Sequence, residues 1–267
     1  MEKLNLSVIL PIKSGVVPFF DDYFKKSIDS VKEQKVQVNE LIIVHTDETY
    51  LVNFLNEYDF EDLNVKKLVW TDTPNFANQV NYGIENSESE WISILEFDDE
   101  YSKIWFDNVL KYSKFYPDVS VFLPVVVDVD GKGVFAGFTN EGTFALNLTD
   151  EMGILSNELL QNFQNFQISG AAYKKDIFKN FGYLKESFKL TFGYELFLRL
   201  THNSLRIMTI PKIGYKHINL REGSLFWNYK NGDDKLTQEE VKFWIESAKK
   251  EYFFTNDRTI KFEPQQY

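Results

Sequence analysis

Carboxylate side chains crowd together at residues 96–100 of the chain. A mostly apolar run of strand type, residues 92–95, precedes them, and four of the five residues that follow are acidic. Neighbouring carboxylates repel one another, so this crowding is costly unless a cation neutralises it. Mg²⁺ and Mn²⁺ prefer oxygen ligands and commonly take one or two carboxylates together with substrate phosphates. The acidic run therefore predicts a site for a metal and a diphosphate, with a solvated turn after an edge strand as the alternative.

The elements around this acidic run alternate between strand and helix. Apolar runs of strand length are separated by segments whose apolar residues recur at helical spacing. This alternation is typical of an α/β fold with a mainly parallel sheet, flanked by helices and joined by right-handed crossovers. Ligands of such sheets bind just beyond the carboxyl ends of the strands, where residues 96–100 fall. The predicted strands are residues 6–10, ended by Pro11, and residues 40–44, 65–70 and 91–95; the predicted helices are residues 20–34, 50–58 and 74–87, the last capped by Asp72 or Thr73.

The second half of the chain is less regular. Residues 128–133 resemble a calcium loop superficially, but the later ligands are missing and a hairpin turn is predicted there. Thr237 and Glu240 have the spacing of a capping box at the start of a helix. The other predicted elements are helices at residues 102–115, 174–181, 194–201 and 237–253, strands at 119–127 and 205–210, and a polar loop with a short helix at 150–167.

Composition excludes several classes of protein. The 267 residues are 43% hydrophobic and 16% aromatic, which is too apolar for a disordered chain. The net charge of −11 disfavours a non-specific nucleic-acid binder. Because there is no cysteine, we expect no disulfide, no zinc–thiolate site and no thiol nucleophile. No signal peptide or transmembrane run is recognisable, so a soluble cytoplasmic protein is expected.

Several segments, in a shared order along the chain, resemble the family-2-like glycosyltransferases of GT-A fold. The resemblance runs from residue 6 to about residue 225 and implies a Rossmann-like sheet with a less regular acceptor half. It also implies a nucleoside-diphosphate sugar as donor, Mn²⁺ or Mg²⁺ as cofactor, a glycan or other hydroxyl acceptor, and inversion at the anomeric carbon. The segments that carry it are residues 6–11, 27–34, 40–44, 81–84, 96–99, 170–182 and 195–200.

The resemblance also implies roles for individual residues. Asp98 is expected to anchor the metal, and His217 to complete its ligands; a structural histidine is the alternative for His217. Asp99, Ser169 and Gly170 fall on the acceptor side. The residues expected around the nucleotide sugar are Pro11, Ile12, Lys13, Asp47, Asn81, Glu96 and Phe97.

The chain departs from the family pattern in three places. His45 and Thr46 replace an adjacent acidic pair, so Asp47 is a shifted substitute, and Val80 replaces an arginine. Gly193 stands where the family carries the aspartate that serves as catalytic base.

Glu195 is the residue predicted to act as base in place of Gly193. An i,i+4 ion pair with Arg199 is the alternative for this side chain. The missing aspartate keeps a second hypothesis open, a weakened homologue that binds sugar nucleotides or glycans. A nucleotidyltransferase is disfavoured, because no Gly-rich basic loop follows the first strand.

The predicted domain organisation has one main unit followed by a C-terminal extension. One glycosyltransferase domain is predicted over residues 1–232, divided into a nucleotide-binding half (1–100) and an acceptor half (101–232). Residues 233–267 are predicted to be a C-terminal helix and tail. We also expect the polar segment 147–167 to cover a bound donor. The sequence does not indicate the donor sugar, the acceptor or the oligomeric state.

Overall fold

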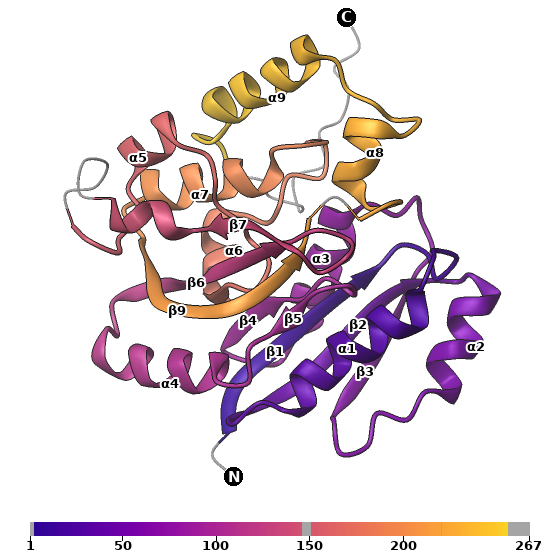
Figure 1. Ribbon diagram of the computed structural model, residues 1–267. Helices are drawn as coiled ribbons and strands as arrows, with labels where there is room; N and C mark the ends of the chain where they lie inside the picture. The colour runs from indigo at the N-terminus through magenta and orange to yellow at the C-terminus, as the bar shows by residue number, and fades with distance from the viewer. Residues whose placement is uncertain (1–2, 146–150, 220, 256–267) are drawn as a thin grey trace, which may run out of the picture.

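The strands form one continuous sheet that passes through both halves of the chain. A computed structural model describes residues 3–145, 151–219 and 221–255. Within these ranges the strand order is β3-β2-β1-β4-β8-β6-β9-β5, and β7 pairs with β6 (Figure 1). The strands are β1 (Lys3–Ile12), β2 (Gln37–Thr46), β3 (Val65–Trp70), β4 (Trp91–Ile94), β5 (Glu100–Tyr101), β6 (Val119–Val129), β7 (Phe135–Thr139), β8 (Ala172–Lys174) and β9 (Arg206–Ile218).

Strand direction distinguishes the two halves. The first four strands are parallel throughout, as continuous apolar runs with helical crossovers predict. β8 then runs antiparallel to both β4 and β6, and β9 returns parallel to β6. The predicted α/β fold, with a mainly parallel sheet and a less regular second half, is confirmed.

Alternating side chains of the strands supply two separate cores. On β1, Val8 and Leu10 face one side of the sheet, whereas Ile9 faces the other. The core on the side of Val8 and Leu10 includes apolar residues of α1, α2 and α4. The core on the side of Ile9 includes apolar residues of α3, α5, α6, α7 and α9. The helices are α1 (Phe20–Lys32), α2 (Thr49–Glu57), α3 (Phe76–Glu85), α4 (Trp105–Phe115), α5 (Asn157–Asn162), α6 (Asp176–Phe181), α7 (Phe192–His202), α8 (Leu225–Asn231) and α9 (Gln238–Glu251), with a 3₁₀ turn, η1, at Glu141–Phe144.

Several element ends differ from the sequence prediction. β1 does not stop before Pro11 but continues to Ile12. Its pairing with β4 ends at Ile9, so the missing N–H of Pro11 does not interrupt that ladder. α3 begins after Asn75, not after Asp72 or Thr73, because the Asn75 side chain accepts the backbone N–H of Asn78 in a capping box.

Other predictions agree with the structure. The predicted hairpin at residues 128–133 connects β6 and β7, and the predicted capping box of Thr237 and Glu240 starts α9. The sequence prediction missed β5, β8 and α8, and it ended β9 at residue 210 instead of 218. Among the described helices none is both long and apolar enough to cross a membrane.

Candidate active site

The acidic residues lie at the carboxyl end of β4, where the loop after that strand meets the end of β9. Hydrogen bonds to both its backbone and its side chain hold Glu96 in position. Its N–H donates to the hydroxyl of Tyr215 at 3.1 Å. The N–H of Gly170 donates to the carbonyl of Ile94 at 2.8 Å and so holds the loop before β8 against β4. The hydroxyl of Ser169 then reaches the Glu96 carboxylate at 2.7 Å.

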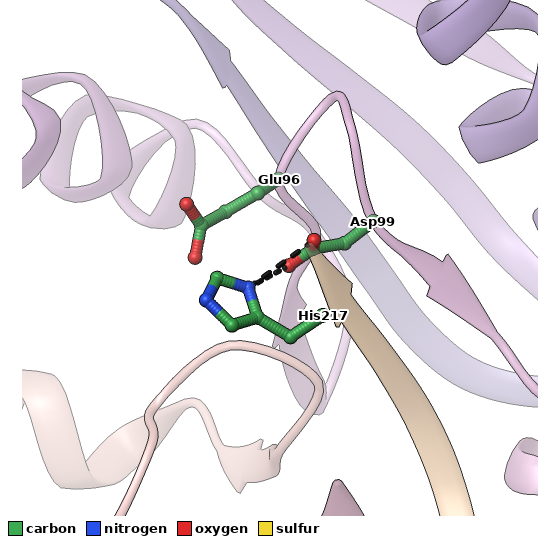
Figure 2. A group of neighbouring side chains, drawn as sticks. All are labelled: Glu96, Asp99 and His217. Atoms are coloured by element: carbon green, nitrogen blue, oxygen red, sulfur yellow. Dashed lines mark hydrogen bonds and ion pairs between the residues drawn. The ribbon is translucent and has the colours of Figure 1, made fainter. Parts of the chain in front are cut away.

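Glu96, Asp99 and His217 form a group able to hold a metal. One ligand atom of each lies within 4.8 Å of the others. Figure 2 shows the carboxylates of Glu96 and Asp99 facing the imidazole of His217 from two sides. Asp99 is fixed most firmly, since one of its oxygens accepts from Nδ1 of His217 at 2.9 Å and the other from the N–H of Ile218 at 2.9 Å. Two carboxylates and an imidazole are a donor set suited to Mn²⁺.

Burial and mutual repulsion shift the protonation of this group. Burial, with repulsion from Asp99, raises the pKa of Glu96 to about 7. Burial disfavours the imidazolium of His217, but the charge and hydrogen bond of Asp99 outweigh it and raise the pKa of His217 to about 10. Without a metal, the imidazolium therefore supplies the positive charge that the carboxylates need. A bound cation would take over that role and release the proton.

Asp98 has a different partner from its neighbour Asp99. Nε of Arg221 donates to the Asp98 carboxylate, and both side chains are buried. The guanidinium also lies over the rings of Phe97 and Tyr23, with its carbon 4.8 Å and 5.8 Å from the ring centroids. Of the two residues predicted to bind the metal, only His217 belongs to the metal-capable group. Asp99, predicted on the acceptor side, belongs to that group too, and the metal role of Asp98 stays a prediction.

A cavity of about 420 Å³ opens beside this group. Its polar wall carries Glu96, Asp98, Asp128, Ser169 and His217. Apolar side chains line the cavity as well, among them Phe76, Leu190, Phe192, Leu225, Phe226 and Ile245.

Residues 164–167 also line the cavity, and they belong to the segment predicted to cover a donor. Residues 147–150 of that segment lie outside the described residues, and the covering role stays a prediction.

Gly170 has no room for a side chain. Its φ is +81°, and an added Cβ would lie 2.5 Å from the Tyr215 ring. We expect Gly170→Ala to lower the free energy of unfolding by about 2–4 kcal/mol, combining the left-handed backbone cost with overpacking. Denaturant unfolding measures the loss. Gly137→Ala is the control, because nothing lies within 4 Å of a Cβ there. Equal stability of the two variants would contradict the prediction.

Comparison with known families agrees with this geometry. The model of glycosyl transferase family 2 matches residues 7–185, which hold the acidic loop, Ser169 and Gly170. The chain belongs to glycosyl transferase family 2.

The structure of this glycosyltransferase is similar to that of TarS of S. aureus. TarS 1–349 in complex with UDP-GlcNAc matches with a TM-score of 0.62 and 19% identity, over 85% of this chain and 61% of that one. TarS 1–349 in complex with UDP matches with a TM-score of 0.59 and 17% identity, over 91% and 78%. A longer TarS structure matches over 96% of this chain, which spans 44% of it. No curated protein matched this glycosyltransferase.

The residues predicted around the nucleotide are in two environments. Pro11 and Ile12 are buried at the carboxyl end of β1, whereas Lys13 and Asp47 are exposed beyond β1 and β2. None of these four lines the cavity, so their roles stay predictions. His45 is buried, and its Nδ1 is hydrogen-bonded to the carbonyl of Thr46.

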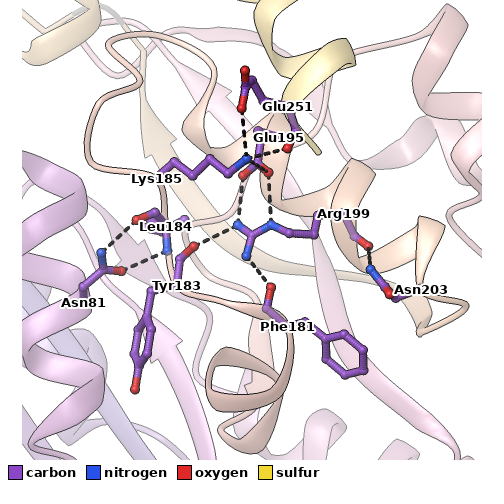
Figure 3. Close-up of polar contacts among 9 residues, drawn as sticks. All are labelled: Asn81, Phe181, Tyr183, Leu184, Lys185, Glu195, Arg199, Asn203 and Glu251. Atoms are coloured by element: carbon purple, nitrogen blue, oxygen red, sulfur yellow. Dashed lines mark hydrogen bonds and ion pairs between the residues drawn. The ribbon is translucent and has the colours of Figure 1, made fainter. Parts of the chain in front are cut away.

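The side chain of Asn81 is hydrogen-bonded to the backbone of a distant segment. The side chain is fully buried, and its amide bonds both the N–H and the carbonyl of Leu184, at 3.0 Å and 2.8 Å (Figure 3). It thereby joins α3 to the loop between α6 and α7. A contact with the nucleotide, as the resemblance implied, would require this pair of bonds to open.

Glu195 is fully buried in an ion-pair network (Figure 3). Its two oxygens accept from Nε and a terminal nitrogen of Arg199 at 3.0 Å and 2.9 Å. Nζ of Lys185 lies 3.2 Å away. The alternative of an ion pair with Arg199 is therefore confirmed. Glu195 does not line the cavity, whereas Gly193 does, so proton abstraction by Glu195 would require the network to break.

Sequence reasoning missed three residues of the site. Tyr215 and Asp128 lie on long strands whose pairing brings Asp128 beside His217. Arg221 follows β9 and reaches back to the acidic loop. In the sequence, Asp128 stands at the start of the predicted hairpin. An aspartate is common in such turns, so its position did not indicate a functional role. Tyr215 and Arg221 gave no signal beyond their proximity in sequence to His217.

Proposed function

We propose that this glycosyltransferase takes a nucleoside-diphosphate sugar as donor and transfers its sugar, with inversion, to an acceptor hydroxyl. The observation that carries the proposal is the group formed by Glu96, Asp99 and His217 at the carboxyl end of the sheet, where α/β proteins bind nucleotides. UDP-GlcNAc is bound by the structurally similar TarS, which makes it the first donor to examine.

A divalent cation fits this group. The three side chains offer oxygen and nitrogen ligands close together, and a bound cation could replace the proton that His217 otherwise carries. When bound there, Mn²⁺ or Mg²⁺ would neutralise the charge that develops on the leaving diphosphate. Asp99 orients His217 for binding, and Ser169 orients Glu96. The apolar side chains of the lining, such as Phe76 and Phe192, would help to exclude water from the sugar.

Binding of donor can be measured without knowing the acceptor. Thermal unfolding is followed with UDP-GlcNAc, UDP and a panel of other nucleotide sugars, each with and without Mn²⁺. A ligand at a hundred times its dissociation constant should add about 2.7 kcal/mol to stability. We expect a nucleotide sugar of the panel to stabilise the protein only when Mn²⁺ is present. No stabilisation by any nucleotide sugar would contradict the proposal.

A binding protein without transferase activity is the second candidate, because Gly193 leaves the cavity without a carboxylate at that position. It predicts the same Mn²⁺-dependent binding. It predicts no release of nucleoside diphosphate from the bound donor, and that measurement separates the two candidates.

A further inference from the structure

Transfer to a hydroxyl needs a group that removes its proton as the new bond forms. The cavity of this protein has no side chain for this at Gly193. Glu195 is closed off by Arg199 and Lys185. Among the residues that the structure describes, the base is therefore sought in another side chain that lines the same cavity.

Three carboxylates line the cavity among the residues that the structure describes: Glu96, Asp98 and Asp128. Glu96 belongs to the metal-capable group, and Asp98 is neutralised by Arg221. Asp128 differs from both of these carboxylates. It lies outside the metal-capable group and has no ion-pair partner within the described ranges.

The surroundings of Asp128 hold it in one orientation. It is next to last in β6, pairs in register with His217 of β9, and is only 7% exposed. Its Oδ2 accepts from the hydroxyl of Thr139, on the neighbouring β7, at 2.7 Å. Thr139 lines the cavity as well. Within the described part of the chain no hydrogen-bond donor contacts Oδ1, so this oxygen is available to an acceptor.

We propose that Asp128 is the general base of this glycosyltransferase, and the assignment rests on the function proposed above. The acceptor oxygen attacks the anomeric carbon while its proton passes to Oδ1 of Asp128. The bond between the anomeric carbon and the diphosphate oxygen breaks, and its electron pair leaves with the diphosphate. The products are the glycoside, the nucleoside diphosphate and a protonated Asp128, which returns its proton to solvent. Thr139 is a positioning residue for this step.

Asp128→Asn tests the assignment. The amide keeps the size of the side chain and can still accept from Thr139, but it cannot take a proton. Asp130→Asn is the matched control, since Asp130 lies two residues further on, in the exposed turn outside the cavity. The reaction is release of UDP from UDP-GlcNAc with Mn²⁺, where water serves as acceptor, or the same reaction with whichever nucleotide sugar of the panel binds. Binding of the donor is measured separately by calorimetry.

We expect Asp128→Asn to bind the donor within about threefold of the wild-type affinity. We expect its release of nucleoside diphosphate to be slower than that of the wild type by about 100-fold or more. Asp130→Asn should match the wild type in both measurements. Release by Asp128→Asn at more than a tenth of the wild-type rate would overturn the assignment, and so would loss of donor binding, which would place Asp128 in the donor site. If the wild-type protein binds no nucleotide sugar, the proposed function is itself overturned and the assignment falls with it.

Discussion

Asp99→Asn should remove the effect of Mn²⁺ on nucleotide binding. Asp99 contributes a carboxylate to the metal-capable group and fixes His217 through Nδ1. The amide can still accept the N–H of Ile218, so the fold of the loop should persist. Replacing an outer partner of a metal ligand typically costs 10–100-fold in metal affinity, and we expect about 100-fold or more for a direct ligand. Calorimetric titration of Mn²⁺ with UDP present measures the change.

Asp98→Asn is the matched variant, and it separates two hypotheses. The sequence alone favoured Asp98 as the metal anchor, whereas in the structure Asp98 is paired with Arg221. If Asp99 is the ligand, Asp98→Asn should keep most of the Mn²⁺ effect. Full loss in Asp98→Asn, with binding retained in Asp99→Asn, would restore the sequence hypothesis and would mean that Arg221 gives up Asp98 when the donor arrives.

Glu195→Gln should destabilise the protein severely. The substitution leaves Arg199 and Lys185 without the carboxylate between them, and the side chains of Glu195 and Arg199 are both 0% exposed. Breaking a buried ion pair by removing one partner costs about 3–5 kcal/mol. An exposed helix pair would lose only about 0.5 kcal/mol, so burial raises the expected cost several-fold. Denaturant unfolding measures this loss.

Glu251→Gln supplies the control for that experiment. Glu251 also contacts Lys185, at 3.9 Å, but its side chain is 53% exposed. Solvent screens such a pair, so we expect a loss below about 1 kcal/mol. A Glu195→Gln variant of nearly wild-type stability that binds donor without transferring sugar would instead identify Glu195 as the base, and it would contradict the assignment of Asp128.

The sequence predicted features that depend on neighbouring residues. Residues 65–70 form β3 with the predicted bounds, because apolar residues between polar turns determine a short strand locally. The acidic run after β4 was placed correctly at the carboxyl end of the sheet for the same reason. Family order along the chain added Ser169, which contacts Glu96, and His217.

Features that depend on distant segments could not be predicted from the sequence. Whether Asp98 or Asp99 faces His217 depends on how β9 is aligned with the acidic loop, and Asp128 enters the cavity through the register of β6 and β9. The ion pair of Glu195 with Arg199 follows from helical spacing. Its burial and its contact with Lys185 do not, because a loop from outside the helix supplies that lysine.

The pairing of β4 with β8 has a consequence for experiments on fragments of this protein. β8 lies between β4, in the first half of the chain, and β6, in the second half. A polypeptide that ends near residue 100 would leave the outer edge of β4 bare, with hydrogen-bonding groups open to any other extended chain. Such a fragment should self-associate, and nucleotide affinity measured on it would describe aggregates. Swapping acceptor specificity between relatives therefore calls for grafted loops around an uncut sheet.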